Sequence, residues 1–478
     1  MIRHVPLLAL VIALFAAGCA KAEPPAPPPS LGFHPTPCGA DYTGLAEKVD
    51  CGTLVVEETR GAHNGRVVEL PVVIARATAA DKKPDPVIFL HGGPGGGVVD
   101  GLFYRLRRPD GVTHDRDWIF FDQRGTGLAK PSLDCGVAPL SDAGVTSDAG
   151  VAILQACGKR LQAQGIDLSQ YNSAVIVKDI RDLRQALGIT TYNIYSGSYG
   201  TRVAMAVMQH DPADLRAAVL SSTWPPEASA TGPLGLYVSN NVRKVLRYCA
   251  QDNVCNAKFP NIEARLDARM TEWLKTPVVL DGNTYTADEM GAYLLDEIYG
   301  DEGARRLPST IDKVLKGHYH VMDNFIKYQA GYSEGQFFTT LCSEQFPFES
   351  PDKVDDGAGR DPIAAAVARD AKRFFPVCDA FPTGKPDPVE HQPLTSVIPI
   401  LMLSADIDAG CPAELSEIAV KRLSHAKNYF FPNRMHTIQG SDCSRKMIAE
   451  FFETANPNVN ADCIKTDRPI FPFIYDDK

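Results

Sequence analysis

The chain has 478 residues, of which 44% are hydrophobic and 22% are charged, and its formal net charge is −10. This composition is that of a globular protein, and it excludes the disordered, collagen-like and multi-span membrane classes. Because nucleic acid is bound by basic faces and none is evident in this acidic chain, we expect no nucleic-acid partner.

The N-terminus resembles an export signal. Arg3 precedes an apolar run, Val5 to Ala17, which is too short for a comfortable membrane span and is followed by Gly18-Cys19. A buried N-terminal helix is the alternative, but Pro-rich sequence follows at once. Because Cys19 after Ala-Gly resembles a bacterial lipobox, we expect residues 1–19 to be a lipoprotein signal, with simple secretion as the other outcome. Residues 20–37 would then be an extended tether at the cell envelope, on the periplasmic side.

The cysteines agree with export, because twelve is a high number for a cytosolic enzyme. Most of them fall into close pairs at which disulfides would staple loops: Cys38/Cys51, Cys135/Cys157, Cys249/Cys255, Cys342/Cys378 and Cys443/Cys463. The spacings alone leave the connectivity open. Metal ligation is the alternative, but there is no CxxC motif and no Cys/His cluster with zinc spacing. If Cys19 is lipidated, Cys411 is the odd cysteine.

The first predicted elements are strands. Residues 53–57 and 66–77 have strand composition, and Asn64-Gly65 between them is a typical hairpin turn. Two short apolar runs, 86–90 and 118–121, each end at a glycine-rich loop. Such runs are typical of buried parallel strands.

A repeating pattern of helices and strands follows. Apolar residues at helical spacing from Ile176 to Leu187 predict a helix that ends at Gly188. A strand, a helix and a strand come next, predicted at 192–196, 201–209 and 217–222. This order indicates a doubly wound α/β sheet.

The α/β pattern stops at Trp224, where a mainly helical stretch begins, and it resumes with apolar runs at 397–403 and 429–431. Because both halves of the sheet are needed for one core, we predict an α/β domain that is interrupted by a helical cap. The predicted parts are the signal (1–19), the tether (20–37), the α/β core (38–224 and 390–478) and the cap (225–389).

A candidate nucleophile lies between the predicted strand and helix, in Ser196-Gly197-Ser198-Tyr199-Gly200. A nucleophile elbow has the form G-x-S-x-G, because the sharp strand-to-helix turn leaves little room beside the serine. Ser196 replaces the first glycine and is small enough to fit. An ordinary turn is the alternative, but the position between a strand and a helix predicts that Ser198 is the nucleophile.

A second motif, His91-Gly92-Gly93-Pro94-Gly95, follows the strand predicted at 86–90. Backbone amides held by glycines can point at a developing oxyanion, with the amide of Tyr199 as a second donor. A flexible glycine loop is one alternative. A phosphate-binding loop is another, but no Gly-Lys-Ser/Thr follows the motif.

The acid and base candidates lie in the C-terminal part of the sheet. The strand at 397–403 leads to Asp408, where a carboxylate could orient a histidine, and Asp406 is the alternative. His436 follows the apolar run 429–431 and is the predicted base, with His425 as the competitor. Ser, Asp and His then occur in the chain order expected for this kind of triad.

These motifs together resemble a known family. The chain is similar to the proline iminopeptidase family of α/β-hydrolases, and more narrowly to its secreted, tripeptidyl-aminopeptidase-like branch. The resemblance rests on HGGPG at 91–95, DQRGTG at 122–127, GSYG at 197–200, CGTL at 51–54, LRQALGI at 183–189, CAQDNVC at 249–255 and GSDC at 440–443. It implies Ser198, Asp408 and His436 as the triad, with Gly93 and Tyr199 as oxyanion donors.

The same resemblance implies that acidic residues of the cap bind the free amino group of the substrate. The candidate is Glu344, since a Cys342–Cys378 bridge would fix its position, and a solvated surface glutamate is the alternative. Such a carboxylate would accept a charge-assisted hydrogen bond from the α-ammonium, worth about 1.5–3 kcal/mol. No motif resembles a metal site or a dinucleotide loop, so we expect neither a metal nor a cofactor.

The leading hypothesis is an exported serine aminopeptidase that releases N-terminal residues or short peptides through an acyl-enzyme on Ser198. A carboxylesterase, or another small-acyl hydrolase with the same triad, is the second hypothesis. A catalytically silent binding protein is the third. The expected partner is therefore a peptide or small acyl substrate, with a membrane tether through lipidated Cys19, while the peptide length and the oligomeric state are left open.

Overall fold

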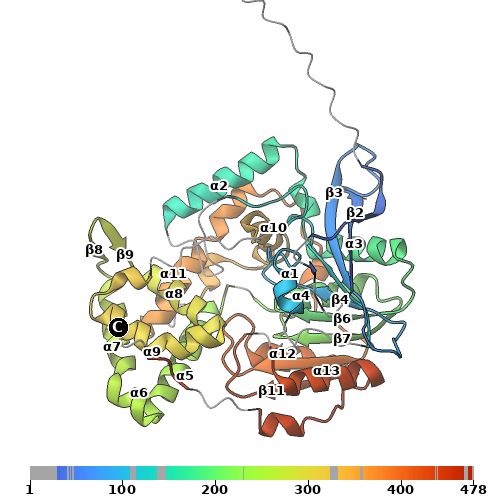
Figure 1. Cartoon of the computed structure of the whole chain (residues 1–478). Helices are drawn as coiled ribbons and strands as arrows, with labels where there is room; N and C mark the ends of the chain where they lie inside the picture. The colour runs from blue at the N-terminus through green and yellow to red at the C-terminus, as the bar shows by residue number, and fades with distance from the viewer. Residues whose placement is uncertain are drawn as a thin grey trace, which may run out of the picture.

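The computed structural model (Figure 1) describes residues 29–39, 42, 43, 45, 48–107, 115–136, 147–229, 231–322, 332–355, 359–436, 438, 440–467 and 472–475. The predicted signal at 1–19, the lipidation of Cys19 and the first part of the tether lie outside the described residues. They therefore remain predictions.

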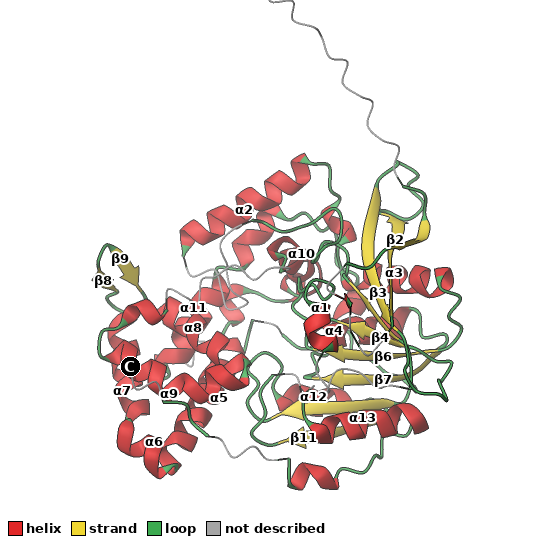
Figure 2. Cartoon of the chain, in the orientation of Figure 1, coloured by secondary structure: helices red, strands yellow, loops and turns green. Residues whose placement is uncertain are grey.

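A nine-stranded mixed sheet lies at the right of Figure 2. Its strand order is β1-β2-β3-β5-β4-β6-β7-β10-β11. The strands are β1 (Gly32–Thr36), β2 (Val49–Glu57), β3 (Val67–Ala75), β4 (Val87–Leu90), β5 (Trp118–Phe121), β6 (Tyr192–Gly197), β7 (Leu215–Ser221), β10 (Ile400–Ala405) and β11 (Ala426–Phe431). The strands from β5 to β11 in this order are parallel, and β1, β2 and β3 pair antiparallel at one side.

The parallel strands are short and apolar because both of their faces are covered. Every residue of β4, β5, β6 and β10 is buried, as the continuous apolar runs predict. One face packs against α3 (Ser173–Ala186), α4 (Tyr199–His210) and α12 (Ala413–Val420). The other face packs against α1 (Leu102–Leu106) and α13 (Asp442–Thr454). The fold is thus the predicted α/β sheet with helices on both sides.

The segment between β7 and β10 is mainly helical and forms a cap beside the sheet, at the left of Figure 1. Most of its helices share one hydrophobic cluster, which also receives Phe473 from the C-terminal segment. The elements of that cluster are α5 (Leu234–Gln251), α6 (Asn253–Lys258), α7 (Ile262–Trp273), α8 (Ala287–Tyr299), α9 (Asp301–Leu315) and α11 (Pro362–Lys372), with the hairpin β8 (Val278–Leu280) and β9 (Asn283–Tyr285).

A second group of helices does not follow the division into core and cap that the sequence suggests. α10 (Glu334–Glu344) belongs to the inserted segment, but it packs against α2 (Asp148–Ala163), which precedes the nucleophile motif in the chain. Leu154 and Leu161 of α2 share a cluster with Phe338 and Leu341 of α10. Conversely, Ile407 and Met435, from loops that follow sheet strands, lie in the large cap cluster.

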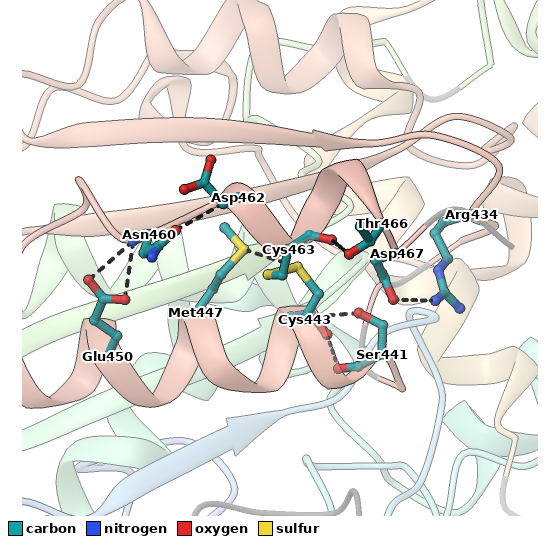
Figure 3. Close-up of a disulfide and its surroundings, with 11 residues drawn as sticks. Arg434, Ser441, Cys443, Met447, Glu450, Asn460, Asp462, Cys463, Thr466 and Asp467 are labelled. Atoms are coloured by element: carbon teal, nitrogen blue, oxygen red, sulfur yellow. Dashed lines mark hydrogen bonds and ion pairs between the residues drawn. A yellow bond between two sulfur atoms is a disulfide. The ribbon is translucent and has the colours of Figure 1, made fainter.

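The disulfide pairs are those that the spacings suggest, so the disulfide prediction is confirmed. Cys38–Cys51, Cys135–Cys157, Cys249–Cys255, Cys342–Cys378 and Cys443–Cys463 are bonded, and Cys411 is free and buried. Figure 3 shows how Cys463 joins the C-terminal segment to the first turn of α13 at Cys443. Because disulfides persist in oxidising compartments, they indicate a non-cytoplasmic protein. Over the described residues, no helix combines the length and the apolarity that a membrane span needs.

Candidate active site

The predicted nucleophile Ser198 lies at the sharp turn between β6 and α4. Its backbone has φ 56° and ψ −131°, a conformation that non-glycine residues rarely adopt and that is found at functional sites. Its N–H donates to the backbone oxygen of Ser221 at the end of β7, and its own backbone oxygen accepts from Thr201 N–H in the first turn of α4. The turn is therefore held from both the sheet and the helix.

The small residues around Ser198 are required by close packing. A Cβ on Gly200 would lie 2.2 Å from the backbone oxygen of Leu90 in the neighbouring strand, so only glycine fits there. Ser196 is tolerated at the first position of the motif because its side chain points into the sheet, where its Oγ donates to the backbone oxygen of Val219 at 2.8 Å. The departure from glycine therefore leaves the elbow intact.

The predicted oxyanion loop lies against the same serine. A Cβ on Gly92 would be 2.8 Å from the Cβ of Ser198, and one on Gly93 would be 2.8 Å from the amide nitrogens of Gly95 and Gly96. Gly93 also has φ 120°, which favours glycine. The structure thus brings Gly92, Gly93 and Ser198 to one cavity, and Gly92 is the glycine in closest contact with the serine.

The DQRGTG segment at 122–127 supports the glycine loop at 91–95 through hydrogen bonds. Gln123 donates from Nε2 to the backbone oxygen of His91, and Asp122 accepts the N–H groups of Val98, Val99 and Leu128. His91 lines the Ser198 cavity, and burial, with a smaller effect of Arg105, lowers its pKa to about 4. Its ring is therefore neutral at pH 7, and its Nδ1 lies 3.2 Å from the backbone oxygen of Gly92.

The predicted acid and base form a direct pair. Nδ1–H of His436 donates to Oδ1 of Asp408 at 2.7 Å, and the acid side chain is completely buried. His436 and Ser198 line the same cavity. The structure therefore brings together the three predicted triad residues, although they come from three separate loops at the carboxyl ends of β6, β10 and β11.

The competing candidates lie elsewhere. Asp406 binds Nζ of Lys244 at 2.9 Å and the hydroxyl of Tyr248 at 2.7 Å, so its carboxylate is engaged by the cap. His425 lies just before β11 and its Nδ1 is 2.9 Å from the backbone oxygen of Val397. Both observations agree with the selection of Asp408 and His436.

The loop that carries His436 is held at several points. Ile438 N–H donates to Oγ of Ser221, the residue whose backbone oxygen also binds Ser198 N–H. Arg434 forms an ion pair with Asp467 at 3.0 Å, close to the Cys443–Cys463 disulfide, as Figure 3 shows. Ser221 was not singled out from the sequence, because a serine at the end of a strand has no motif that separates it from other small residues.

The cavity above Ser198 has a volume of about 460 Å³ and a mainly aromatic and aliphatic wall. Tyr299, the last residue of α8, contributes a ring whose centroid is 4.7 Å from that of the His436 ring. Cys411 also lines the cavity, and its N–H donates to Oδ1 of Asp408 at 2.7 Å. Burial, and then the Asp408 charge, raises the pKa of the Cys411 thiol, so this cysteine is a neutral wall group.

The prediction for Glu344 needs correction. The structure places it beneath the cavity rather than in its lining, with a side chain that is 1% exposed. Its carboxylate accepts hydrogen bonds from Nε of Arg202 at 2.8 Å and from the N–H and Oγ of Ser173 at 2.6 and 2.9 Å. Both oxygens are therefore occupied by the protein itself, and the group is not available to a substrate ammonium.

A second acidic residue, Glu390, adjoins the buried ion pair of Glu344 and Arg202. Desolvation, followed by the charge of Glu344, raises the pKa of Glu390 to about 8 against an opposing effect of Arg202. The folded protein thus holds a proton that the unfolded chain releases near pH 4.5. Because the native state then binds more protons, stability falls as the pH rises from about 4.5 to about 8.

We therefore expect Glu390→Gln to weaken this pH dependence. The variant should have a Tm close to that of the wild type at pH 5 and above it at pH 9, because an amide has no charge to bury. Thermal scans at both values test this result. Glu272→Gln, on the outer side of α7, is the matched control with no expected change at either value. A variant that loses Tm equally at pH 5 and 9 would contradict the expectation.

A neighbouring cavity offers a different carboxylate. It has a volume of about 290 Å³, shares Ser229 with the larger cavity, and is lined by Glu227, Glu349 and His391. Oε2 of Glu227 and Nδ1 of His391 are buried there and have no hydrogen-bond partner among the described residues. Sequence reasoning missed Glu227, although it lies only a few residues after Trp224 at the start of the predicted cap.

No group of His, Cys, Asp and Glu within the described part of the chain has the arrangement of a metal site.

The chain is similar in sequence to known proteins. Residues 85–441 match a family described as the alpha/beta hydrolase fold. A proline iminopeptidase of Xylella fastidiosa is 32% identical over 130 residues, which are 27% of this chain and 28% of that enzyme. The serine protease Hip1 of Mycobacterium tuberculosis is 23% identical over 453 residues, 84% of each chain. A crystal structure of proline iminopeptidase from Mycobacterium smegmatis has a TM-score of 0.40 and 15% identity, covering 84% of this chain and 97% of that one.

Proposed function

Because the chain belongs to the α/β-hydrolase fold family, we propose that it is an exported serine hydrolase with Ser198 as nucleophile, His436 as base and Asp408 as acid. The observation that carries the proposal is the 2.7 Å hydrogen bond between His436 and Asp408, at a cavity that also contains Ser198. The strained backbone of Ser198 supports the same assignment.

The chemistry follows from the roles of these groups. His436 removes the proton of the Ser198 hydroxyl as its oxygen attacks the scissile carbonyl, and the proton then passes to the leaving group. Asp408 holds the imidazole in the required tautomer and stabilises the imidazolium. The amides of Gly93 and Tyr199 are the proposed donors to the oxyanion. Water then hydrolyses the acyl-enzyme by the reverse sequence of proton transfers.

We further propose that the substrate is a peptide with a free amino terminus. The relatives named proline iminopeptidase and serine protease support a peptidase. Glu227 supports recognition of an ammonium, because it lines the cavity that adjoins the Ser198 cavity and its buried Oε2 has no hydrogen-bond partner among the described residues. It replaces Glu344 as the candidate for this role.

Glu227→Gln is expected to lower kcat/KM for free-amine substrates by about 10- to 100-fold, which corresponds to the loss of a charge-assisted hydrogen bond. N-acetylated substrates and a nitrophenyl ester should be affected less than about twofold, because they present no ammonium. Steady-state kinetics on matched pairs of substrates measures both. An equal loss on free and acetylated substrates would mean that Glu227 does not read the amino group.

A substrate panel tests the proposed function. It contains proline and alanine aminoacyl amides, an Ala-Ala-Pro-type tripeptide amide, the N-acetylated forms and a nitrophenyl ester. Cleavage of the free-amine substrates, with loss on acetylation, is the expected result. Cleavage of the ester alone would indicate a carboxylesterase, and absence of turnover together with absence of fluorophosphonate labelling would indicate a silent binding protein.

The site of action is proposed to be the cell envelope or periplasm. The disulfides support an oxidising compartment, and the lipobox-like Cys19 supports a membrane tether. Mass spectrometry of the mature N-terminus tests the tether, because lipidation adds acyl chains to Cys19 whereas simple secretion leaves an unmodified N-terminal peptide.

A further inference from the structure

The loop that carries the proposed acid runs along one face of the cap helix α5. Asn241, Lys244 and Tyr248 are spaced three and four residues apart, so their side chains emerge on the same side of the helix. Lys244 and Tyr248 both bind Asp406, at 2.9 and 2.7 Å, and Asn241 binds Asp408. The cap therefore contacts the acid loop at two alternate residues.

The contact between Asn241 and Asp408 is a closed pair of hydrogen bonds. The N–H of Asp408 donates to Oδ1 of Asn241 at 3.1 Å, and Nδ2 of Asn241 donates to the backbone oxygen of Asp408 at 3.3 Å. Nδ2 also donates to the backbone oxygen of Tyr237, one turn earlier in α5. Asn241 is 6% exposed and Asp408 is 1% exposed, so water does not replace either bond at low cost.

The backbone of Asp408 determines where its carboxylate lies. Oδ1 accepts the N–H of Cys411 and the Nδ1–H of His436, whereas Oδ2 is buried and accepts no hydrogen bond from the described residues. Hydrogen bonds from the described residues therefore restrain only Oδ1 of the Asp408 carboxylate. The adjoining side chains Ile407 and Ala409 are packed into the hydrophobic cluster of the cap, together with Met435 beside the base.

We infer that Asn241 is a positioning residue for Asp408, and that the cap holds the acid and the base in register with Ser198 through this face of α5. The inference rests on the proposed triad. It assigns to the cap, besides any contact with substrate, a part in the geometry of the reaction itself. A displacement of about 1 Å at such a site can lower the rate about 10²-fold.

The test compares Asn241→Leu with Asn240→Leu in the full mature protein. Asn240 is the adjacent residue of α5 and is exposed, so its substitution is a matched control for helix propensity. For Asn241→Leu we expect kcat on the nitrophenyl ester to fall about 10- to 100-fold with KM changed less than about twofold. The far-downfield proton resonance of the His436–Asp408 hydrogen bond should shift or broaden. Asn240→Leu should leave both unchanged.

A second variant, Asn241→Asp, tests the inference if Asn241→Leu does not fold. Asn241→Asp retains the acceptor for the Asp408 N–H and removes the donor to its backbone oxygen, so it should give an intermediate loss of kcat. A kcat for folded Asn241→Leu and Asn241→Asp that equals the Asn240→Leu value would overturn the inference. So would a downfield resonance that is identical in all variants.

The rate of labelling by a fluorophosphonate distinguishes a failure of this inference from a failure of the proposed function. If the wild type reacts with a fluorophosphonate but cleaves no peptide substrate, the aminopeptidase proposal fails, and the ratio of labelling rates between Asn241→Leu and Asn240→Leu still tests the role of Asn241. If the wild type is not labelled, the triad itself is absent and the inference fails with it.

Discussion

Replacement of Ser198 by alanine is expected to reduce kcat by about 10⁴- to 10⁶-fold, because the alanine methyl group cannot attack the scissile carbonyl. The residual rate would come from the oxyanion donors and substrate binding. The elbow should be preserved, since its hydrogen bonds to Ser221 and Thr201 use the backbone of residue 198. Turnover of the ester and of the best peptide substrate, with fluorophosphonate labelling, measures the effect.

Ser424→Ala is the control for this experiment, because Ser424 is exposed on the loop before β11 and lies outside the cavity. It should retain wild-type turnover and labelling. If Ser198→Ala kept more than about a tenth of the wild-type kcat, the acyl-enzyme mechanism on Ser198 would be wrong.

Glu344→Gln is expected to lower the free energy of unfolding by about 3–5 kcal/mol, because it leaves the Arg202 guanidinium without its buried counter-ion. Arg202 is 2% exposed and is anchored by further hydrogen bonds to the backbone oxygens of Pro226 and Glu390, so it cannot follow its partner into water. Since typical stabilities are about 5–15 kcal/mol, this loss is a large fraction of the total.

Thermal and urea unfolding measure this loss, with Glu272→Gln as a control that should stay within about 0.5 kcal/mol. The folded fraction of Glu344→Gln should keep the wild-type KM ratio between free and acetylated substrates. An unchanged Tm together with a KM raised only for free-amine substrates would restore Glu344 as the ammonium site. The two substitutions, Glu344→Gln and Glu227→Gln, therefore separate structural support from substrate recognition.

Strands and turns whose formation depends on residues close together in the chain were predictable from the sequence. The run 118–121 is β5 with the predicted bounds, and the nucleophile motif lies between β6 and α4 as expected. The spacing of the cysteines indicated where disulfides would form, and the structure determined their connectivity. Helix α2 was missed, and its apolar face is explained only by its contact with α10 in a distant part of the chain.

The predicted site residues also form two groups: those that local sequence features identify, and those whose surroundings depend on distant parts of the chain. Ser198, Asp408 and His436 were selected by motif, order and position at strand ends, and in the structure Ser198 and His436 line one cavity while Asp408 binds His436. Glu344 was selected by its place in the cap, but its burial depends on Arg202, which is 142 positions away in the chain. No local pattern carries that information.

The sequence by itself determined the parallel strands, the elbow, the glycine loops and the chain order of the predicted triad, because periodicity, turn chemistry and steric limits act between neighbouring residues. Only the tertiary structure decided that Arg202 and Ser173 occupy the Glu344 carboxylate and that Oε2 of Glu227 has no hydrogen-bond partner among the described residues. It also decided that α5 holds the acid loop through Asn241, 167 positions from Asp408. These assignments depend on which side chains meet when the cap closes on the sheet, and burial then sets the cost of leaving each polar group without a partner.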